Sequence, residues 1–255
     1  MTALALFPAI DLLGGRCVRL RQGDYDRVSV YDEDPVAVAR RWAADGAEWL
    51  HVVDLEGART GHPAHLAALG AICRATGLTV QYGGGLRTMA DIKSALAAGA
   101  ARVILGTAAA REPEFLAECL ATWDDAIAVS VDARAGKAAV AGWRETTDEA
   151  ALDLARRMGD AGVRTLILTN VERDGTLAGV EVAPLAAVRA AVAPDVALIA
   201  AGGITTLEDL RQLAAVGVGG AVLGNALYTG ALDLAAALAA ARGLRIYGGK
   251  GGAAC

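Results

Sequence analysis

The sequence predicts a single (βα)8 TIM barrel built from two duplicated half-barrels, and two observations support this prediction. Short apolar segments alternate with amphipathic, Ala- and Leu-rich segments along the chain, which is typical of parallel strands separated by helices. The second half of the chain also repeats the first, and a closed eightfold barrel accommodates such a duplication. The 255 residues suit one α/β domain of this kind.

Each expected strand is a short apolar run bounded by turn or helix signals. In chain order the strands are Leu4–Ile10, Trp49–Asp54, Thr79–Gln81, Arg102–Leu105, Ala126–Val131, Thr165–Thr169, Ala197–Ala200 and Ala221–Leu223. Several of the intervening segments begin on Asp or Thr and end on Gly, as capped helices do. These segments include DPVAVARRWAADG, TMADIKSALAAG, EPEFLAECLATW, TDEAALDLARRMGDAG and TLEDLRQLAAVG. No linker interrupts the pattern, so residues 1–244 are expected to form one barrel, followed by a disordered Gly-rich tail at 245–255.

The internal repeat is clearest between Gly83–Ala108 and Ala201–Ala226, which align without a gap. Nine of the twenty-six aligned positions are identical. A second alignment places Asp11 over Asp132, and each of the two follows an apolar run. Because the carboxyl ends of the strands form the active site in this fold, we expect the two Asp residues to face each other across the barrel mouth.

Asp11 and Asp132 are therefore the first candidate catalytic residues. A charge at the end of a buried strand costs desolvation energy unless it has partners or a function. The alternative is that each Asp only caps a loop or pairs with an Arg, for which Arg19 and Arg134 are available. Their equivalent places in the repeat favour a catalytic role. Asp174, in the loop after the sixth strand, is a third candidate.

Glycines follow four of the strands and precede helices. Glycine lets backbone amides approach a phosphate closely, and the helix N-terminus adds partial positive charge. Barrels often bind phosphate after the seventh and eighth strands, and here the third and fourth strands carry a copy, which predicts a ligand with a phosphate at each end. The phosphate- and substrate-binding candidates are Arg19, Gly84, Gly85, Arg87, Gly106, Thr107, Trp143, Thr169, Gly202, Gly203, Gly224 and Asn225.

Composition and spacing exclude several other functions. The net charge of −5, without a basic stripe, argues against a nucleic-acid partner, and no apolar run is long enough for a membrane span. The four cysteines are widely spaced and are expected to be reduced thiols in a cytoplasmic protein. The three histidines lack metal-ligand spacing, so no metal site is expected. His51 lies within a strand and is interpreted as a core histidine.

The motifs FPAIDLLGGRCVRLRQGDY, GGGLRT, SVDARAGK, RDGTLAG and AGGITTLEDL resemble, in this order, the phosphoribosylformimino-aminoimidazole-carboxamide ribotide isomerases of histidine biosynthesis. The resemblance covers roughly residues 4–242. It implies a cofactor-independent Amadori rearrangement of a small bisphosphorylated aminoaldose. It also implies that Asp11 accepts a proton and Asp132 donates one, with Asp174 able to share the acid role. We expect the protein to be a monomer.

The sequence departs from this family at Tyr82, Asn170, Val180-Glu181 and Asn225, so altered affinity with retained activity is expected. Three alternatives remain. The sister cyclase typically has Lys in place of Arg19 and a Cys before its first catalytic Asp, neither of which occurs here. A dual-specificity isomerase that also accepts phosphoribosylanthranilate is compatible with the sequence. A catalytically silent phosphosugar-binding barrel is disfavoured by the intact Asp pair.

Overall fold

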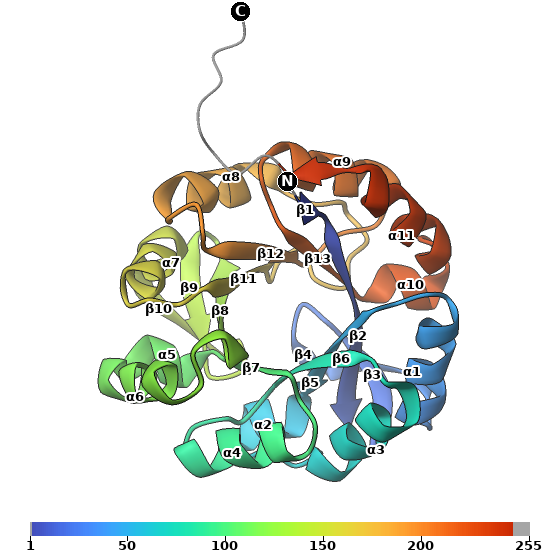
Figure 1. The fold of residues 1–255 in the computed structure, drawn as a ribbon, viewed down its shortest axis with the longest axis horizontal. Helices are drawn as coiled ribbons and strands as arrows, with labels where there is room; N and C mark the ends of the chain where they lie inside the picture. Colours follow the sequence, from blue (N-terminus) through green and yellow to red (C-terminus); the bar gives the residue numbers. More distant parts are fainter. Residues whose placement is uncertain (1, 247–255) are drawn as a thin grey trace, which may run out of the picture.

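A computed structural model describes residues 2–246 and shows a closed barrel surrounded by helices (Figure 1). The barrel strands are parallel and follow chain order, and the last pairs with the first to close the ring. They are β2 (Ala5–Leu13), β5 (Trp49–Asp54), β6 (Thr79–Gly83), β7 (Arg102–Leu105), β8 (Ile127–Arg134), β11 (Thr165–Asn170), β12 (Ala197–Ala201) and β13 (Gly220–Leu223). The predicted (βα)8 barrel is confirmed.

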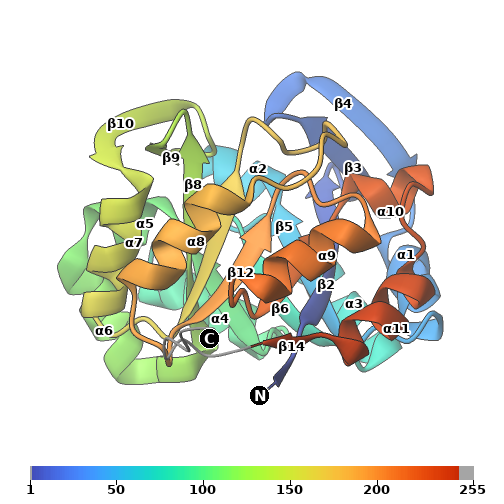
Figure 2. The ribbon, with the colours of Figure 1, turned by 90° about the horizontal axis from the view of Figure 1, so that it is seen from above.

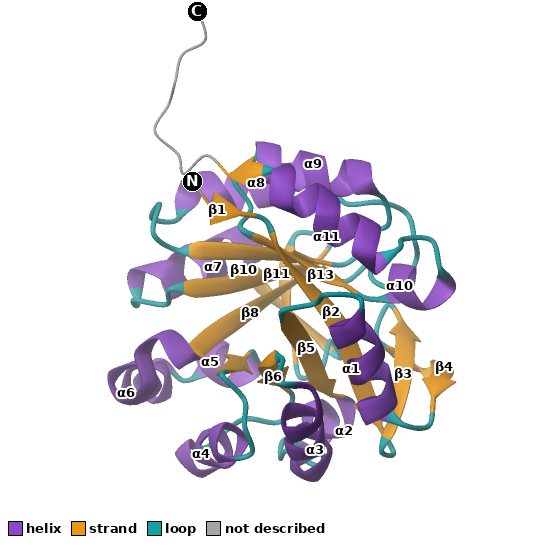
Figure 3. Cartoon of the chain, turned by 45° about the vertical axis from the view of Figure 1, so that its right-hand side comes forward, coloured by secondary structure: helices purple, strands orange, loops and turns teal. Residues whose placement is uncertain are grey.

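The helices cover the outside of the barrel (Figure 3). The longer ones are α1 (Pro35–Ala44), α3 (Leu66–Thr76), α4 (Met89–Ala97), α6 (Pro113–Trp123), α7 (Ala151–Asp160), α8 (Val182–Ala191), α9 (Leu207–Ala215) and α11 (Leu234–Gly243). Short helical turns are α2 (Leu55–Thr60), α5 (Thr107–Arg111), η1 (Asp124–Ala126) and α10 (Asn225–Thr229). Apolar helix faces pack on the outward side chains of the strands, and a smaller apolar cluster that includes Phe7, Ile104 and Ile199 fills the barrel interior.

Two antiparallel hairpins follow the strands that end near Asp11 and Asp132, where the sequence was interpreted as loops. They are β3 (Arg16–Arg21) with β4 (Asp24–Asp32), and β9 (Lys137–Val140) with β10 (Glu145–Ala150). Asp11 lies opposite Val18 and Asp132 opposite Ala139, which are matching positions of the repeat. Both hairpins rise at the same end of the barrel (Figure 2). Each half-barrel therefore carries one hairpin at the mouth.

The repeat also extends to helix capping. Thr88 and Asp91 form a capping box at the start of α4, and Thr206 and Asp209 form the same box at the start of α9. In each, the Thr side chain accepts from one backbone amide while the carboxylate accepts from another, which satisfies two free helix-end donors. The glycine loops before these helices are thus held in the same way in both halves.

The chain ends differ from the prediction at one boundary. Arg245–Ile246 (β14) pairs antiparallel with Thr2–Ala3 (β1) in a separate two-stranded sheet, so these two residues form regular structure although the tail was expected to begin at residue 245. The physical reason is that the Ile246 side chain is buried in the main core. The rest of the expected tail, 247–255, lies outside the described residues. Between residues 2 and 246, no helix has the length and apolar character to span a membrane.

Candidate active site

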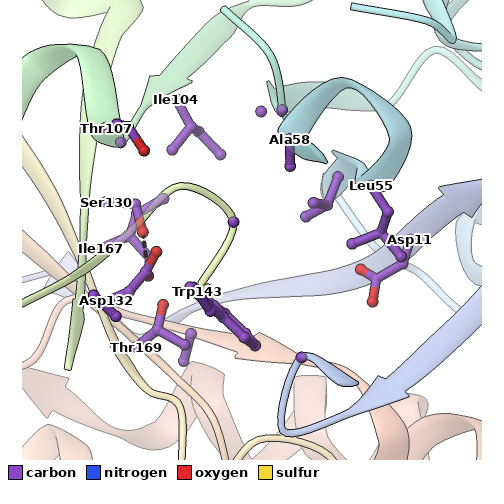
Figure 4. Close-up of a pocket in the computed structure, with 18 of the residues that line it drawn as sticks. Asp11, Leu55, Ala58, Ile104, Thr107, Ser130, Asp132, Trp143, Ile167 and Thr169 are labelled. Carbon is purple, nitrogen blue, oxygen red and sulfur yellow. Dashed lines mark hydrogen bonds between the residues drawn. The ribbon is translucent and has the colours of Figure 1, made fainter. Parts of the chain in front are cut away.

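A cavity opens between the two hairpins at the carboxyl ends of the barrel strands (Figure 4). Asp11, Asp132 and Asp174 all line it. In Figure 4 Asp132 lies on one side with Ser130, and Asp11 lies across the cavity. The structure thus brings the three candidate catalytic carboxylates of the sequence into one site.

Asp11 is buried at the end of β2 and forms an ion pair with Arg19 of the adjacent hairpin, with Oδ2 2.9 Å from Nη1. Nη2 of the same guanidinium lies 3.6 Å from Oδ1 of Asp174. Burial raises the pKa of Asp11 to about 6, although Arg19 pulls it down. The ion pair with Arg19 that was the structural alternative for Asp11 therefore exists, but both residues line the cavity, so the pairing does not remove Asp11 from the site.

Asp132 has neutral partners instead. Ser130 donates its hydroxyl hydrogen to Oδ1 at 2.6 Å, and the polar side-chain groups of Trp143 and Thr169 lie near the carboxylate. Burial raises the pKa of Asp132, and the surrounding hydroxyl and indole donors oppose that shift. Arg134 donates to the backbone oxygen of Trp143 at 2.9 Å and forms no ion pair with Asp132 among the described residues. Two carboxylates in such different surroundings can hold opposite protonation states.

Asp174 interacts electrostatically with both the Asp11–Arg19 pair and Asp132. It lies in the turn after β11, and its backbone oxygen accepts a hydrogen bond of 3.2 Å from Gln22 in the first hairpin. Burial raises the pKa of Asp174, Arg19 lowers it and the negative charge of Asp132 raises it. Its side chain is therefore electrostatically coupled to both sides of the cavity.

The first glycine clamp (Gly84, Gly85, Gly106 and Thr107) lines this cavity. A Cβ at Gly84 would overlap the backbone oxygen of Asp54, so close packing alone requires glycine there. Gly106 meets no atom within 4 Å at its Cβ position, which leaves its backbone accessible to a ligand. Thr107 begins α5, and its hydroxyl accepts from the Ala141 amide at 2.8 Å.

The second glycine clamp (Gly202, Gly203, Gly224 and Asn225) lines a smaller adjoining cavity. Arg19 and Asp174 line both cavities, so the two are continuous around this pair. Asn225, where the resemblance leads one to expect a cation, accepts from the Tyr31 hydroxyl at 2.9 Å and donates to the Gly175 oxygen at 3.1 Å. The clamps therefore flank the carboxylates from two sides.

The remaining predicted ligand residues also lie at the mouth. The Trp143 ring packs against Gly23, so the tips of the two hairpins touch. Thr169 is buried in the cavity wall beside Asp132. Arg87 lines the cavity, and its guanidinium lies against Gly61 at the end of α2.

Sequence reasoning missed Ser130, although it lies two residues before Asp132 on the same strand and side chains alternate between faces with a period of two. It also interpreted His51 as a core residue. The side chain is buried, but it lines the cavity.

Two residues noted in the sequence have structural roles. Asp54 caps α2 by accepting from the Gly57 amide at 2.7 Å. The unusual Tyr82 donates its hydroxyl hydrogen to Asp54 at 2.7 Å.

Residues 2–246 contain His, Cys, Asp and Glu side chains that could in principle bind metal ions. That part of the chain holds no group of three or more His, Cys, Asp or Glu side chains placed to bind a metal ion. Cys17, Cys73 and Cys119 are free thiols. The polar side chains that line the cavity include carboxylates, hydroxyls, guanidinium groups, one indole and one imidazole.

Comparison with known proteins assigns the family. Residues 5–233 match the family described as histidine biosynthesis protein. A Roseiflexus (strain RS-1) protein is 54% identical over 238 residues, covering 93% of this chain and 99% of that protein. Relatives from Paracoccus denitrificans and Acetivibrio thermocellus are 49% and 41% identical, covering 93% and 94% of this chain and 99% and 100% of their own.

All three relatives are named 1-(5-phosphoribosyl)-5-((5-phosphoribosylamino)methylideneamino) imidazole-4-carboxamide isomerase. The family match covers most of the chain, and the identities are high over nearly all of it. The chain therefore belongs to the histidine biosynthesis protein family and is similar to its imidazole-4-carboxamide isomerases.

Proposed function

We propose that this protein is an aldose–ketose isomerase that carries out the Amadori rearrangement of the imidazole-4-carboxamide substrate named for its relatives. That name contains two phosphoribosyl groups. The observation that carries the proposal is the position of Asp11 and Asp132 on opposite sides of one cavity, flanked by the two glycine clamps. A ligand with a phosphate in each clamp would place its reacting sugar between the two carboxylates.

The rearrangement needs one acid and one base. The acid protonates the ring oxygen of the aminoaldose, which opens the ring to an imine at C1, and the base removes the proton from C2 to give an enaminol. The enaminol becomes the aminoketose when C1 gains a proton and the C2 hydroxyl loses one. Asp132 suits the acid because its partners are neutral and burial raises its pKa. Asp11 suits the base because Arg19, 2.9 Å away, stabilises its ionised form. Each transfer then occurs between a positioned group and a held substrate.

Arg19 and Asp174 complete this assignment. Arg19 lies between the base and the second glycine clamp, so it can orient a phosphate or hydroxyl while it holds Asp11 ionised. Asp174 is coupled to Asp132 and could exchange the acid's proton with it. No step of this chemistry calls for a cofactor. We also propose that the active form is a monomer and that the enzyme acts in the cytoplasm.

The test is an assay of the purified protein on the histidine-pathway aminoaldose and on phosphoribosylanthranilate. Wild-type protein should convert the first substrate, and Asp11→Asn and Asp132→Asn should each lose nearly all turnover while still binding a bisphosphorylated ligand. Turnover of the second substrate as well would identify a dual-specificity enzyme. Full activity in either variant would contradict the acid–base assignment.

A further inference from the structure

We propose that His51 is a hydrogen-bond donor to the substrate at the floor of the cavity, and that Gln81 and Arg102 are positioning residues that fix its tautomer. The proposal rests on the proposed function and extends it to a residue outside the carboxylate cluster. The side chain of His51 is buried, yet it lines the same cavity as Asp11.

The three side chains come from adjacent strands. His51 on β5 pairs in register with Gln81 on β6, which pairs with Arg102 on β7. Nε and Nη2 of Arg102 donate to Oε1 of Gln81 at 3.2 and 2.6 Å. Nε2 of Gln81 lies 2.7 Å from Nδ1 of His51. A continuous hydrogen-bonded row therefore runs from β7 to the imidazole.

The far end of this row is anchored by packing. The Arg102 guanidinium lies over the Trp49 ring at 4.7 Å and over the Phe7 ring at 5.7 Å. A third nitrogen, Nη1, is 3.4 Å from the Thr165 hydroxyl. Cation–π contacts and hydrogen bonds hold a guanidinium in one plane, so Arg102 presents its donors to Gln81 in a fixed direction.

This arrangement dictates the protonation of His51. A guanidinium has only donors, so the Gln81 atom that faces Arg102 must be the amide oxygen. The NH2 group then faces Nδ1 of His51, which must accept. A neutral imidazole with an accepting Nδ1 carries its hydrogen on Nε2. Protonation of Nδ1 would set two donors against each other.

Electrostatics supports the neutral form. Burial lowers the pKa of His51 to about 3, and the positive charges of Arg19 and Arg102 contribute. His51 therefore cannot supply a proton in place of Asp132 near neutral pH. It remains a neutral N–H donor.

The free donor faces the ligand space. In the described part of the chain, Arg19 Nε is the one side-chain nitrogen or oxygen that is both fully enclosed and without a partner. His51 Nε2 has no partner among those residues either, so it cannot be fully enclosed. Because the His51 side chain lines the cavity, this nitrogen is open to it. His51 lies opposite Ala9, two residues before Asp11, so its donor lies one inward-facing position below the base. From there it would donate to a hydroxyl or forming carbonyl oxygen of the sugar.

The first experiment reads the tautomer in the intact protein without any substrate. Protein labelled with 15N-histidine is studied by long-range proton–nitrogen NMR between pH 5 and 8, with the His51 signals assigned from a His51→Leu sample. We expect an unprotonated Nδ1, a protonated Nε2 and no titration over this range. A pKa near that of free histidine, or a hydrogen on Nδ1, would overturn the proposal.

The second experiment changes the positioning residue. In Gln81→Glu, a carboxylate replaces the amide and can still accept from Arg102, but it now also accepts from Nδ1. The NMR signature should change to a protonated Nδ1, and kcat should fall by more than tenfold with a smaller change in KM. Gln212→Glu, the same substitution on the exposed face of α9, should change neither the His51 signals nor kcat.

The third measurement tests the donor itself. His51→Leu removes the N–H, and loss of one donor to developing charge typically costs on the order of 10²-fold in kcat. His51→Gln, which keeps a donor, should recover part of this loss. Wild-type kcat in folded His51→Leu would contradict the role in catalysis. If wild-type protein shows the expected tautomer but turns over no aminoaldose, the proposed function fails while the positioning of His51 stands.

Discussion

Asp11 and Asp132 are the same side chain in two different environments, and the difference determines what each can do. Asp11 shares a buried ion pair with Arg19, whereas Asp132 accepts a hydrogen bond from the neutral Ser130 hydroxyl. A cation favours the ionised form, and burial with neutral partners favours the protonated form. These different surroundings support the proposed roles of base and acid, and the internal symmetry alone does not provide them, because burial raises the pKa of both carboxylates.

The pH dependence of activity should report this difference. Burial raises the pKa of Asp11 to about 6, and a base must be ionised, so kcat/KM should fall as the pH drops below about 6. Arg19 lowers that pKa; Arg19→Gln should therefore move the acid limb of the profile to higher pH. The measurement is kcat/KM from pH 5 to 9. A limb that keeps its position in Arg19→Gln would show that another group sets it.

Substitution of Asp132 should lower activity but raise the stability of the fold. Burial raises the pKa of Asp132 above its value of 3.8 in an unfolded chain, so the ionised side chain destabilises the folded state at neutral pH. Asp132→Asn should raise the free energy of unfolding at pH 7 by about 1 kcal/mol. The gain should shrink as the pH falls through the folded pKa and disappear below the unfolded value.

Urea unfolding at pH 7 and pH 3.5 measures this gain, and Asp26→Asn, at an exposed position of β4, is the control without a gain. A destabilised Asp132→Asn would mean that its hydrogen bonds outweigh the cost of burying the charge.

At the scale of elements, the glycines of one clamp have separable roles. Gly84 has a φ of +116°, and a Cβ there would overlap the backbone of Asp54. Gly84→Ala should therefore cost about 3 kcal/mol of stability. Gly106 has open space at its Cβ position, so Gly106→Ala should cost much less stability and mainly raise KM by crowding the phosphate. Thermal unfolding and KM are the measurements, and equal loss of stability in both variants would contradict this division.

The elements also show which parts of the fold the sequence can reveal. The barrel strands are apolar because they are buried on both faces, and this burial is visible in the sequence. Strand β10 cannot be recognised in the sequence, because Glu145–Ala150 is polar and becomes a strand only through pairing with β9. The Asp pair was found through the repeat. The row from Arg102 through Gln81 to His51 could not be found, because it depends on the register of three strands.

At the scale of the whole molecule, each hairpin binds the clamp of the other half-barrel. Ala141, between the strands of the second hairpin, donates to Thr107 of the first clamp. Tyr31 of the first hairpin donates to Asn225 of the second clamp. The hairpins also meet where Trp143 packs on Gly23. A phosphate bound in either clamp is thus next to a contact that joins the two halves.

This architecture predicts two phosphate sites per chain, and a ligand that bridges them. Inorganic phosphate, followed by 31P NMR titration, should bind twice, whereas a bisphosphorylated substrate analogue should bind once and displace both ions. The analogue should bind far more tightly than either phosphate, because occupation of one clamp holds the second phosphate at a high effective concentration near the other.

Gly106→Ala should remove one inorganic phosphate and leave the second, since the clamps come from different halves of the chain. The substitution should weaken the affinity for the analogue more than the affinity for phosphate at the intact clamp. The analogue loses one phosphate contact and also the high effective concentration that comes from binding both clamps at once. A single phosphate site in the wild-type protein, or loss of both sites in this variant, would show that the duplicated glycine loops do not act as two independent clamps. The repeat would then account for the barrel but not for the shape of its substrate.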